Sequence, residues 1–113
     1  MQIVFQSRDA EGASMRKLAI ERVQFAMRRL SWLVPRAKVQ LSDINGPHGG
    51  VDKRCQLEFK TANKGTVVVT AIAREWGEAL NGALARAARK LVREFRKTRN
   101  QTRARTGSPA INR

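Results

Sequence analysis

The residues of this chain best suited to chemistry are basic side chains between positions 86 and 97. They recur at spacings of three and four residues, so on a helix they fall within about 120° of one another. The members of this set are Arg86, Arg89, Lys90, Arg93, Arg96 and Lys97. Guanidinium groups bind phosphate through paired hydrogen bonds, and ammonium groups bind it as point charges. The pattern therefore predicts a surface that binds a polyanion.

A helix face that is merely solvated is the alternative interpretation of these cations. Such a face usually mixes charges of both signs, whereas Glu94 is the only acidic residue from Arg86 to Arg113. Like charges three and four residues apart repel each other, which lowers the stability of the helix. The sequence thus favours a partner that neutralises them.

The other reactive side chains are isolated. Cys55 is the single cysteine and His48 the single histidine, so we expect neither an internal disulfide nor a metal site. Cys55 is expected to be a small buried side chain on a strand. No Ser, Cys or carboxylate pair is placed to work with His48, so we expect no catalytic residues, no cofactor and no small-molecule substrate.

His48 lies in the glycine-rich segment Gly46–Gly50. Backbone amides of such a turn can hold a phosphate. However, the segment lacks both the following helix and the Lys-Ser/Thr pair of a nucleotide-binding loop. We therefore expect an ordinary mobile connection here.

Four strands are expected to support these side chains, because apolar and polar residues alternate there with period two. The expected strands are Gln2 to Gln6, Ala37 to Ile44, Lys53 to Lys60 and Thr66 to Ala73. A short turn at Ala62–Gly65 should join the last two, so the last three strands form a meander.

The first helix is expected to begin after Ser14 as its N-cap and to end near Leu33, before Pro35. Besides its main apolar stripe it carries Phe25 and Trp32, seven residues apart. These aromatic rings could stack on bases, but we expect them to close the edge of the core, because aromatic burial is favourable.

The second helix is expected from Glu75 to Thr98, with an apolar face rich in alanine and leucine. Residues 100–113 combine arginines with Gly, Ser, Pro and Thr and show no periodicity. The sequence thus predicts one domain over residues 1–99 and a flexible basic tail over residues 100–113.

The element order β-α-β-β-β-α predicts an α+β fold, a two-layer sandwich of a four-stranded sheet with two helices on one face. The first β-α-β unit should pair its two strands in parallel through a right-handed crossover. An RNA recognition motif would carry aromatic residues on its central strands, but Phe59 is on the apolar side of its strand. The double-stranded RNA-binding domain has a related plan and reads the RNA backbone.

The 113 residues suffice for one domain with a modest core. The formal net charge is +14, from 23 Lys and Arg against 9 Asp and Glu. Such a charge attracts nucleic acid, an anionic membrane or an acidic protein. No apolar run reaches about 18 residues, and the N-terminus lacks the pattern of a secretory signal, so we expect a cytoplasmic protein.

Three segments carry a family resemblance that extends from Met1 to about Arg99. They are Val39–Asp43, Asp52–Cys55 and Glu75–Leu91. In these segments the chain resembles the short form of the ribosome hibernation-promoting factor and ribosome-associated inhibitor family. Two positions depart from the family pattern: Gly77 stands where relatives often have tyrosine, and Asn81 replaces the commoner aspartate.

The resemblance implies a protein, not an enzyme, that docks on the RNA of the small ribosomal subunit, in the channel for messenger and transfer RNA. Together with the basic pattern, it predicts which residues bind RNA. These are Arg86, Arg89, Lys90, Arg93, Arg96 and Lys97, extended by Lys53 and Arg54 and widened by Arg22 and Arg29.

Two alternatives stay open: a general module for double-stranded RNA or other nucleic acid, and a basic interaction protein that grips an acidic partner or an anionic membrane. A membrane-binding helix should carry bulky apolar residues opposite its charges, whereas this apolar face is rich in alanine. We therefore expect no membrane partner.

Overall fold

The computed structural model describes the backbone of residues 1–44, 52–62 and 65–111, and the side chains in these ranges up to Arg96. The described strands are β1 (Gln2–Ser7), β2 (Arg36–Asp43), β3 (Lys53–Lys60) and β4 (Thr66–Ala73). The described helices are α1 (Ala10–Ala13), α2 (Arg16–Met27) and α3 (Trp76–Ile111). The segment Gly46–Gly50, including His48, lies outside the described residues.

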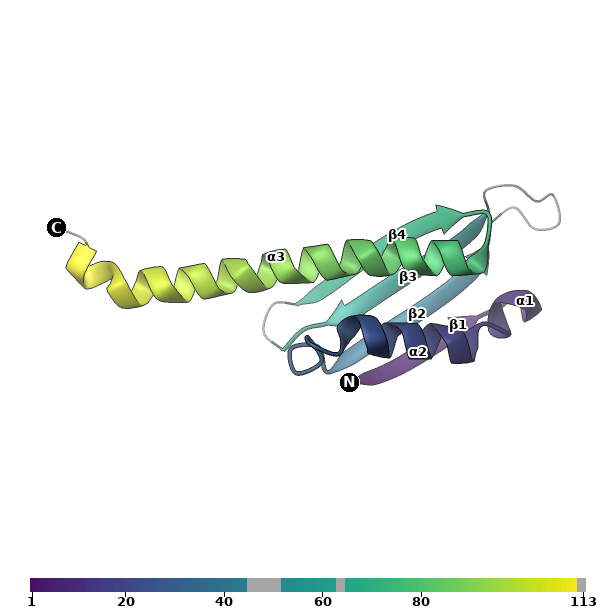
Figure 1. The fold of residues 1–113 in the computed structure, drawn as a ribbon, viewed down its shortest axis with the longest axis horizontal. Helices are drawn as coiled ribbons and strands as arrows, with labels where there is room; N and C mark the ends of the chain where they lie inside the picture. The colour runs from purple at the N-terminus through teal and green to yellow at the C-terminus, as the bar shows by residue number, and fades with distance from the viewer. Residues whose placement is uncertain (45–51, 63–64, 112–113) are drawn as a thin grey trace.

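The strands form one sheet in the order β1-β2-β3-β4 (Figure 1). β1 runs parallel to β2, and the pairs β2–β3 and β3–β4 are antiparallel. In the register, Leu57 of β3 stands opposite Val39 of β2 and Val69 of β4. The predicted parallel pair and meander are confirmed.

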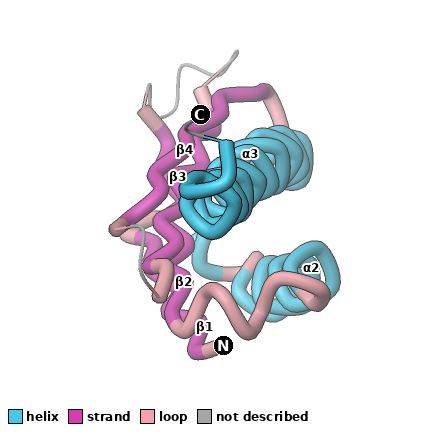
Figure 2. Tube along the Cα trace, turned by 90° about the vertical axis from the view of Figure 1, so that its left-hand side faces the viewer, coloured by secondary structure: helices cyan, strands magenta, loops and turns pink. Residues whose placement is uncertain are grey.

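Both long helices lie on the same face of the sheet (Figure 2). α3 packs on β3 and β4, while α2 packs beside it and contacts β1. The predicted two-layer α+β fold is therefore confirmed.

The core lies between these layers, and alternate residues of each strand enter it because successive side chains point to opposite faces. From the strands the buried side chains are Ala37, Val39, Leu41, Cys55, Leu57, Phe59, Val67, Val69 and Ala71. Burial raises the pKa of the Cys55 thiol to about 12, so the group stays protonated at neutral pH. The expectation of a buried cysteine is confirmed.

The first helical region differs from the prediction of one helix from Ser14 to Leu33. The Ser14 hydroxyl donates to the carbonyl of Glu11, 2.6 Å away, so it closes the turn of α1 instead of capping α2. After Met27 the chain continues in turns, and the Ser31 hydroxyl donates to the carbonyl of Arg28. The backbone N–H groups of Leu30, Leu33 and Val34 bond to the carbonyl three residues back instead of four, so the helix gives way to turns after Met27.

The last helix begins as predicted but does not end at Thr98. It continues to Ile111 and extends beyond the end of the sheet (Figure 1). The absence of apolar periodicity after Asn100 led to the wrong boundary, although Arg, Gln and Ala favour helix on their own. The division into a domain of residues 1–99 and a separate basic tail stays a prediction.

Candidate nucleic-acid interface

The start of α3 is anchored by Trp76, which is only 5% exposed. Its Nε1 donates to Glu11 Oε1 at 3.0 Å, which connects the helix to α1. Gly12 lies beneath this contact: a Cβ there would meet Ser7 Oγ and would lie 3.2 Å from the Trp76 ring. These contacts fix the N-terminal end of α3 against α1.

The polar side of α3 carries the cations. Arg86, Arg89, Lys90, Arg93 and Arg96 are all exposed, and the side chain of Lys97 lies outside the described side chains. The opposite side packs on the sheet through Leu80, Ala83, Ala87 and Leu91, all of them buried. The predicted exposure of these five cations is confirmed, whereas their binding to phosphate stays a prediction.

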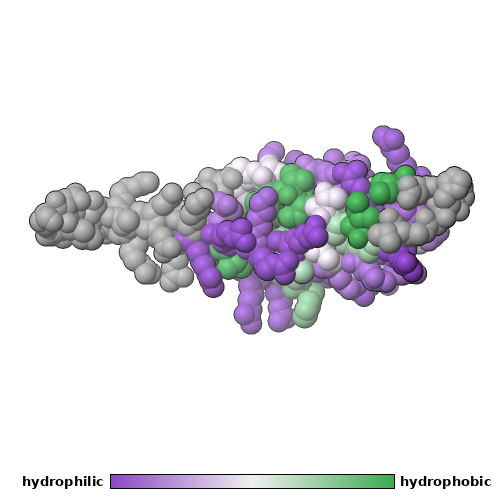
Figure 3. Space-filling model, turned by 90° about the horizontal axis from the view of Figure 1, so that it is seen from above, coloured by the Kyte–Doolittle hydropathy of each residue, from purple (hydrophilic) through white to green (hydrophobic). Residues whose placement is uncertain are grey.

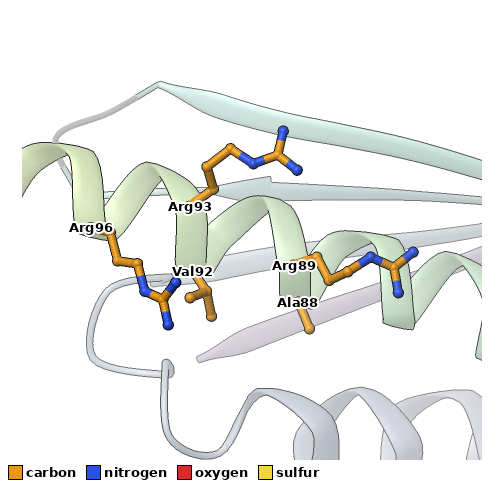
Figure 4. Close-up of a pocket in the computed structure, with 5 residues that line it drawn as sticks. All are labelled: Ala88, Arg89, Val92, Arg93 and Arg96. Carbon is orange, nitrogen blue, oxygen red and sulfur yellow. The ribbon is translucent and has the colours of Figure 1, made fainter.

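The cations are spread around the helix instead of forming one line. Arg93 extends to one side of α3 while Val92 and Arg96 extend to the other (Figure 4). Together with Ala88 and Arg89, these three residues line a shallow pocket of about 440 Å³ on this surface. Seen from the β4 side, hydrophilic side chains gather around α3 with small hydrophobic patches between them (Figure 3).

Arg86 is tied to the sheet. Its Nη1 donates to the backbone carbonyl of Thr70 at 2.6 Å, so part of its guanidinium serves to join α3 to β4. The remaining N–H groups face solvent, because the side chain is exposed. Arg86 can thus position the helix and still present charge.

Lys53 and Arg54 are neighbours on β3 but point to opposite faces of the sheet. The Lys53 Nζ lies 2.9 Å from Asp43 Oδ2, 3.3 Å from Asp52 Oδ1 and 5.4 Å from the centre of the Trp76 ring. The hydrogen bond that Lys53 donates to the Asp43 carboxylate is the main cause that raises the pKa of Lys53. Its charge is balanced inside the protein, which favours a structural role.

Arg54 lies on the face of the sheet that the helices leave open. Its Nη2 donates to Gln56 Oε1 at 2.8 Å on the same strand. The structure therefore does not bring Lys53 and Arg54 together with the cations of α3 into one patch, as the sequence had suggested.

Arg22 connects the two helices. Its Nη1 donates to Asn81 Oδ1 at 2.6 Å, and a Cβ on Gly77 would lie 4.0 Å from the same nitrogen. The two departures from the family pattern, Gly77 and Asn81, thus both adjoin Arg22. Because the amide of Asn81 is neutral, this bond leaves the arginine charge uncompensated. Arg29 is exposed in the turns after α2.

Two aromatic residues are more exposed than the sequence suggested. Phe25 is 67% and Trp32 68% exposed, so the expectation that they close the core is wrong. The buried stripe of α2 is Ala19, Val23 and Met27. Phe25 is two positions from Val23 and hence roughly 200° away around the helix. Trp32 lies in the turns that follow α2, where the helical spacing of seven no longer applies.

The described residues contain neither a metal site nor a membrane-spanning helix. In that part of the chain no three His, Cys, Asp or Glu side chains gather in a way that could bind a metal. Nor do the described helices include one whose length and apolar character would let it cross a membrane.

Comparison with known proteins shows a similarity of fold. No family model and no curated protein matches the sequence. Among solved structures, the chain is similar to the crystal structure of the Thermus thermophilus Protein Y N-terminal domain, with a TM-score of 0.59 and 20% identity. The match covers 82% of this chain and 98% of that one. The two share a fold. This supports the resemblance to the hibernation-factor family at the level of the fold.

Proposed function

We propose that this protein binds the small ribosomal subunit through its RNA and inhibits translation by occupying the channel for messenger and transfer RNA. The observation that carries the proposal is the outer surface of α3, where five Lys and Arg side chains are exposed over Arg86–Arg96. Among those positions only Glu94 is acidic. Phosphate groups of a folded RNA would relieve the mutual repulsion of these cations.

Two further observations support RNA over other polyanions. The sequence resembles the hibernation-factor family along almost its whole length, and its fold is that of the Protein Y N-terminal domain. In addition, arginine outnumbers lysine on α3. The planar guanidinium of arginine can donate two hydrogen bonds at once to the oxygens of one phosphate.

Inhibition by occupation needs binding but no chemical step. α3 is held against the sheet along β3 and β4, so its cations are presented on a rigid support. A rigid surface loses little conformational entropy when it binds, which favours stable docking. A bound protein then excludes other RNA from the same space.

The test reverses two charges on α3. In Arg89→Glu/Arg93→Glu, affinity for purified small subunits should fall at least about tenfold at low salt, because like charges then face the phosphates. Co-sedimentation through a sucrose cushion measures it. The control is Arg36→Glu/Lys60→Glu, which changes the net charge equally on the open face of the sheet, where the two residues stand opposite each other.

The two double variants separate local from general effects. Normal sedimentation of the control with loss of the α3 variant supports the proposal. Equal loss in both would indicate attraction by net charge alone, and normal binding of a folded α3 variant would contradict docking through this helix. Competition by free duplex RNA as strong as that by subunits would instead favour a general RNA-binding module.

A further inference from the structure

An unusual feature of the helical layer is a pair of exposed aromatic rings, one beside an arginine and the other against a phenylalanine. The Phe25 ring is covered on one side by Arg28, whose guanidinium carbon lies 4.8 Å from the ring centre. Trp32 meets Phe95 of α3 edge to face, with 5.3 Å between the ring centres. Both rings are held by neighbours while about two thirds of each residue stays open to solvent.

Phe25 lines a groove between α2 and α3, and Trp32 contacts α3 further along through Phe95. One stretch of about 590 Å³ is lined by both helices, with Phe25 and Arg22 from α2 and Leu84 from α3. Ala88, one turn further along α3, lines the pocket that contains Arg89 and Arg96 (Figure 4). Phe95, which contacts Trp32, follows two turns after Ala88. The two hollows therefore follow each other along α3, with Phe25 lining the first, and Phe95, which contacts Trp32, next to Arg96 of the second in the sequence.

The chemistry of this groove suits one kind of occupant. Its floor is largely apolar, Phe25 and Trp32 are about two thirds exposed, and Arg22, Arg89 and Arg96 lie along it together with the acidic Glu21. Unpaired nucleotides combine flat bases, which stack on aromatic rings, with phosphates, which bind arginine. Bases within a duplex already stack on each other and do not offer their faces.

We propose that the groove between α2 and α3 binds a single-stranded segment of RNA, with bases stacked on Phe25 and Trp32 and phosphates on the flanking arginines. This inference rests on the proposed function and deepens it, because it names unpaired RNA as what the helical face recognises. Docking then has two components: charge attraction along the outer surface of α3 and stacking in the groove.

Tryptophan fluorescence reports directly on the stacking. Trp76 is 5% exposed and Trp32 68%, so a quencher in solution reaches mainly Trp32. A 12-residue oligouridylate should quench the emission. An abasic ribose-phosphate chain of the same length carries the same charge and should bind without quenching. Equal quenching by both chains, or by an acidic peptide such as oligoglutamate, would overturn the proposal.

Salt titration separates stacking from charge. Phe25→Ala and Trp32→Ala should each weaken binding of oligouridylate and of small subunits by about 5- to 150-fold, with an unchanged slope of affinity against salt. The matched control is Ile72→Ala, which removes an apolar side chain that is 48% exposed on the open face of the sheet. Because all three side chains are exposed, the variants should fold, as circular dichroism can verify.

The outcomes distinguish the two proposals. If the wild type sediments with subunits and the variant lacking both rings binds equally well, stacking is wrong while ribosome binding stands. If the wild type does not sediment with subunits but oligouridylate still quenches Trp32, the groove binds single strands and the ribosomal function is wrong.

Discussion

Cys55 illustrates how position decides the chemistry of a single side chain. Its thiol is completely buried between sheet and helices, and the loss of solvent raises its pKa to about 12. In the unfolded chain the thiol has its ordinary pKa of 9.0. The thiolate is the reactive form, so the native protein should resist alkylation.

We predict that Cys55 reacts with iodoacetamide at pH 8 only when the protein unfolds, giving a rate at least about 100-fold faster in denaturing urea. Because the folded pKa lies above the unfolded one, stability is unaffected below pH 9 and should fall as pH rises from about 9 toward 12. Mass spectrometry of the alkylated protein measures the rate, and fast labelling of the native protein would contradict burial.

Asn81 offers a second test at the scale of one residue. In Asn81→Asp, the bond from Arg22 becomes an ion pair near the surface. The free energy of unfolding should rise by at most about 1 kcal/mol at low salt, and the gain should vanish near 1 M salt because of screening. Urea unfolding at two salt concentrations gives the answer. A gain that persists at high salt would mean that the pair is better shielded than its exposure indicates.

Among the elements, the sheet was the most predictable. β3 and β4 have the predicted bounds, because clear alternation leaves little freedom in register. The helices were harder: Ser14 closes the turn of α1, and the backbone changes to turns after Met27, and hydrophobic periodicity indicates neither boundary. The α3 cations were recognisable from spacing alone. The ion pairs of Lys53, by contrast, could not be predicted, because they depend on the register between β2 and β3 and on the position of Asp52.

Two helical glycines give a prediction that separates propensity from packing. A Cβ on Gly82 would lie 3.4 Å from the Ala71 Cβ, an ordinary contact, so Gly82→Ala should stabilise the protein by about 0.5–1 kcal/mol. In α1, Gly12→Ala should destabilise it by about 1–3 kcal/mol, because Ser7 and Trp76 occupy the space. Thermal unfolding of both variants measures the difference, and stabilisation by both would show that α1 packs more loosely than described.

At the scale of the whole molecule, charge and shape act together. The 65 Å length of the molecule comes largely from α3, which extends past the sheet (Figure 1). The net charge of +14 is carried by a chain of only 12.7 kDa. The open face of the sheet also bears basic residues, but Lys38 there is paired with Glu58 at 3.8 Å. The helical layer is consequently the stronger candidate for long-range attraction of RNA.

This distribution predicts a steep dependence of binding on salt. If the surface neutralises about six to ten phosphates, the affinity for small subunits should fall by roughly a thousandfold or more between about 50 and 200 mM salt. Reversing the charges of Arg89 and Arg93 should reduce the slope by the equivalent of about two phosphate contacts. Reversing the charges of Arg36 and Lys60 on the open face should leave the slope unchanged. Filter binding over a salt series measures both. A shallow slope for the wild type would mean that few phosphates are contacted, in which case the exposed cations of α3 would need another partner to explain why they lie together on one helix.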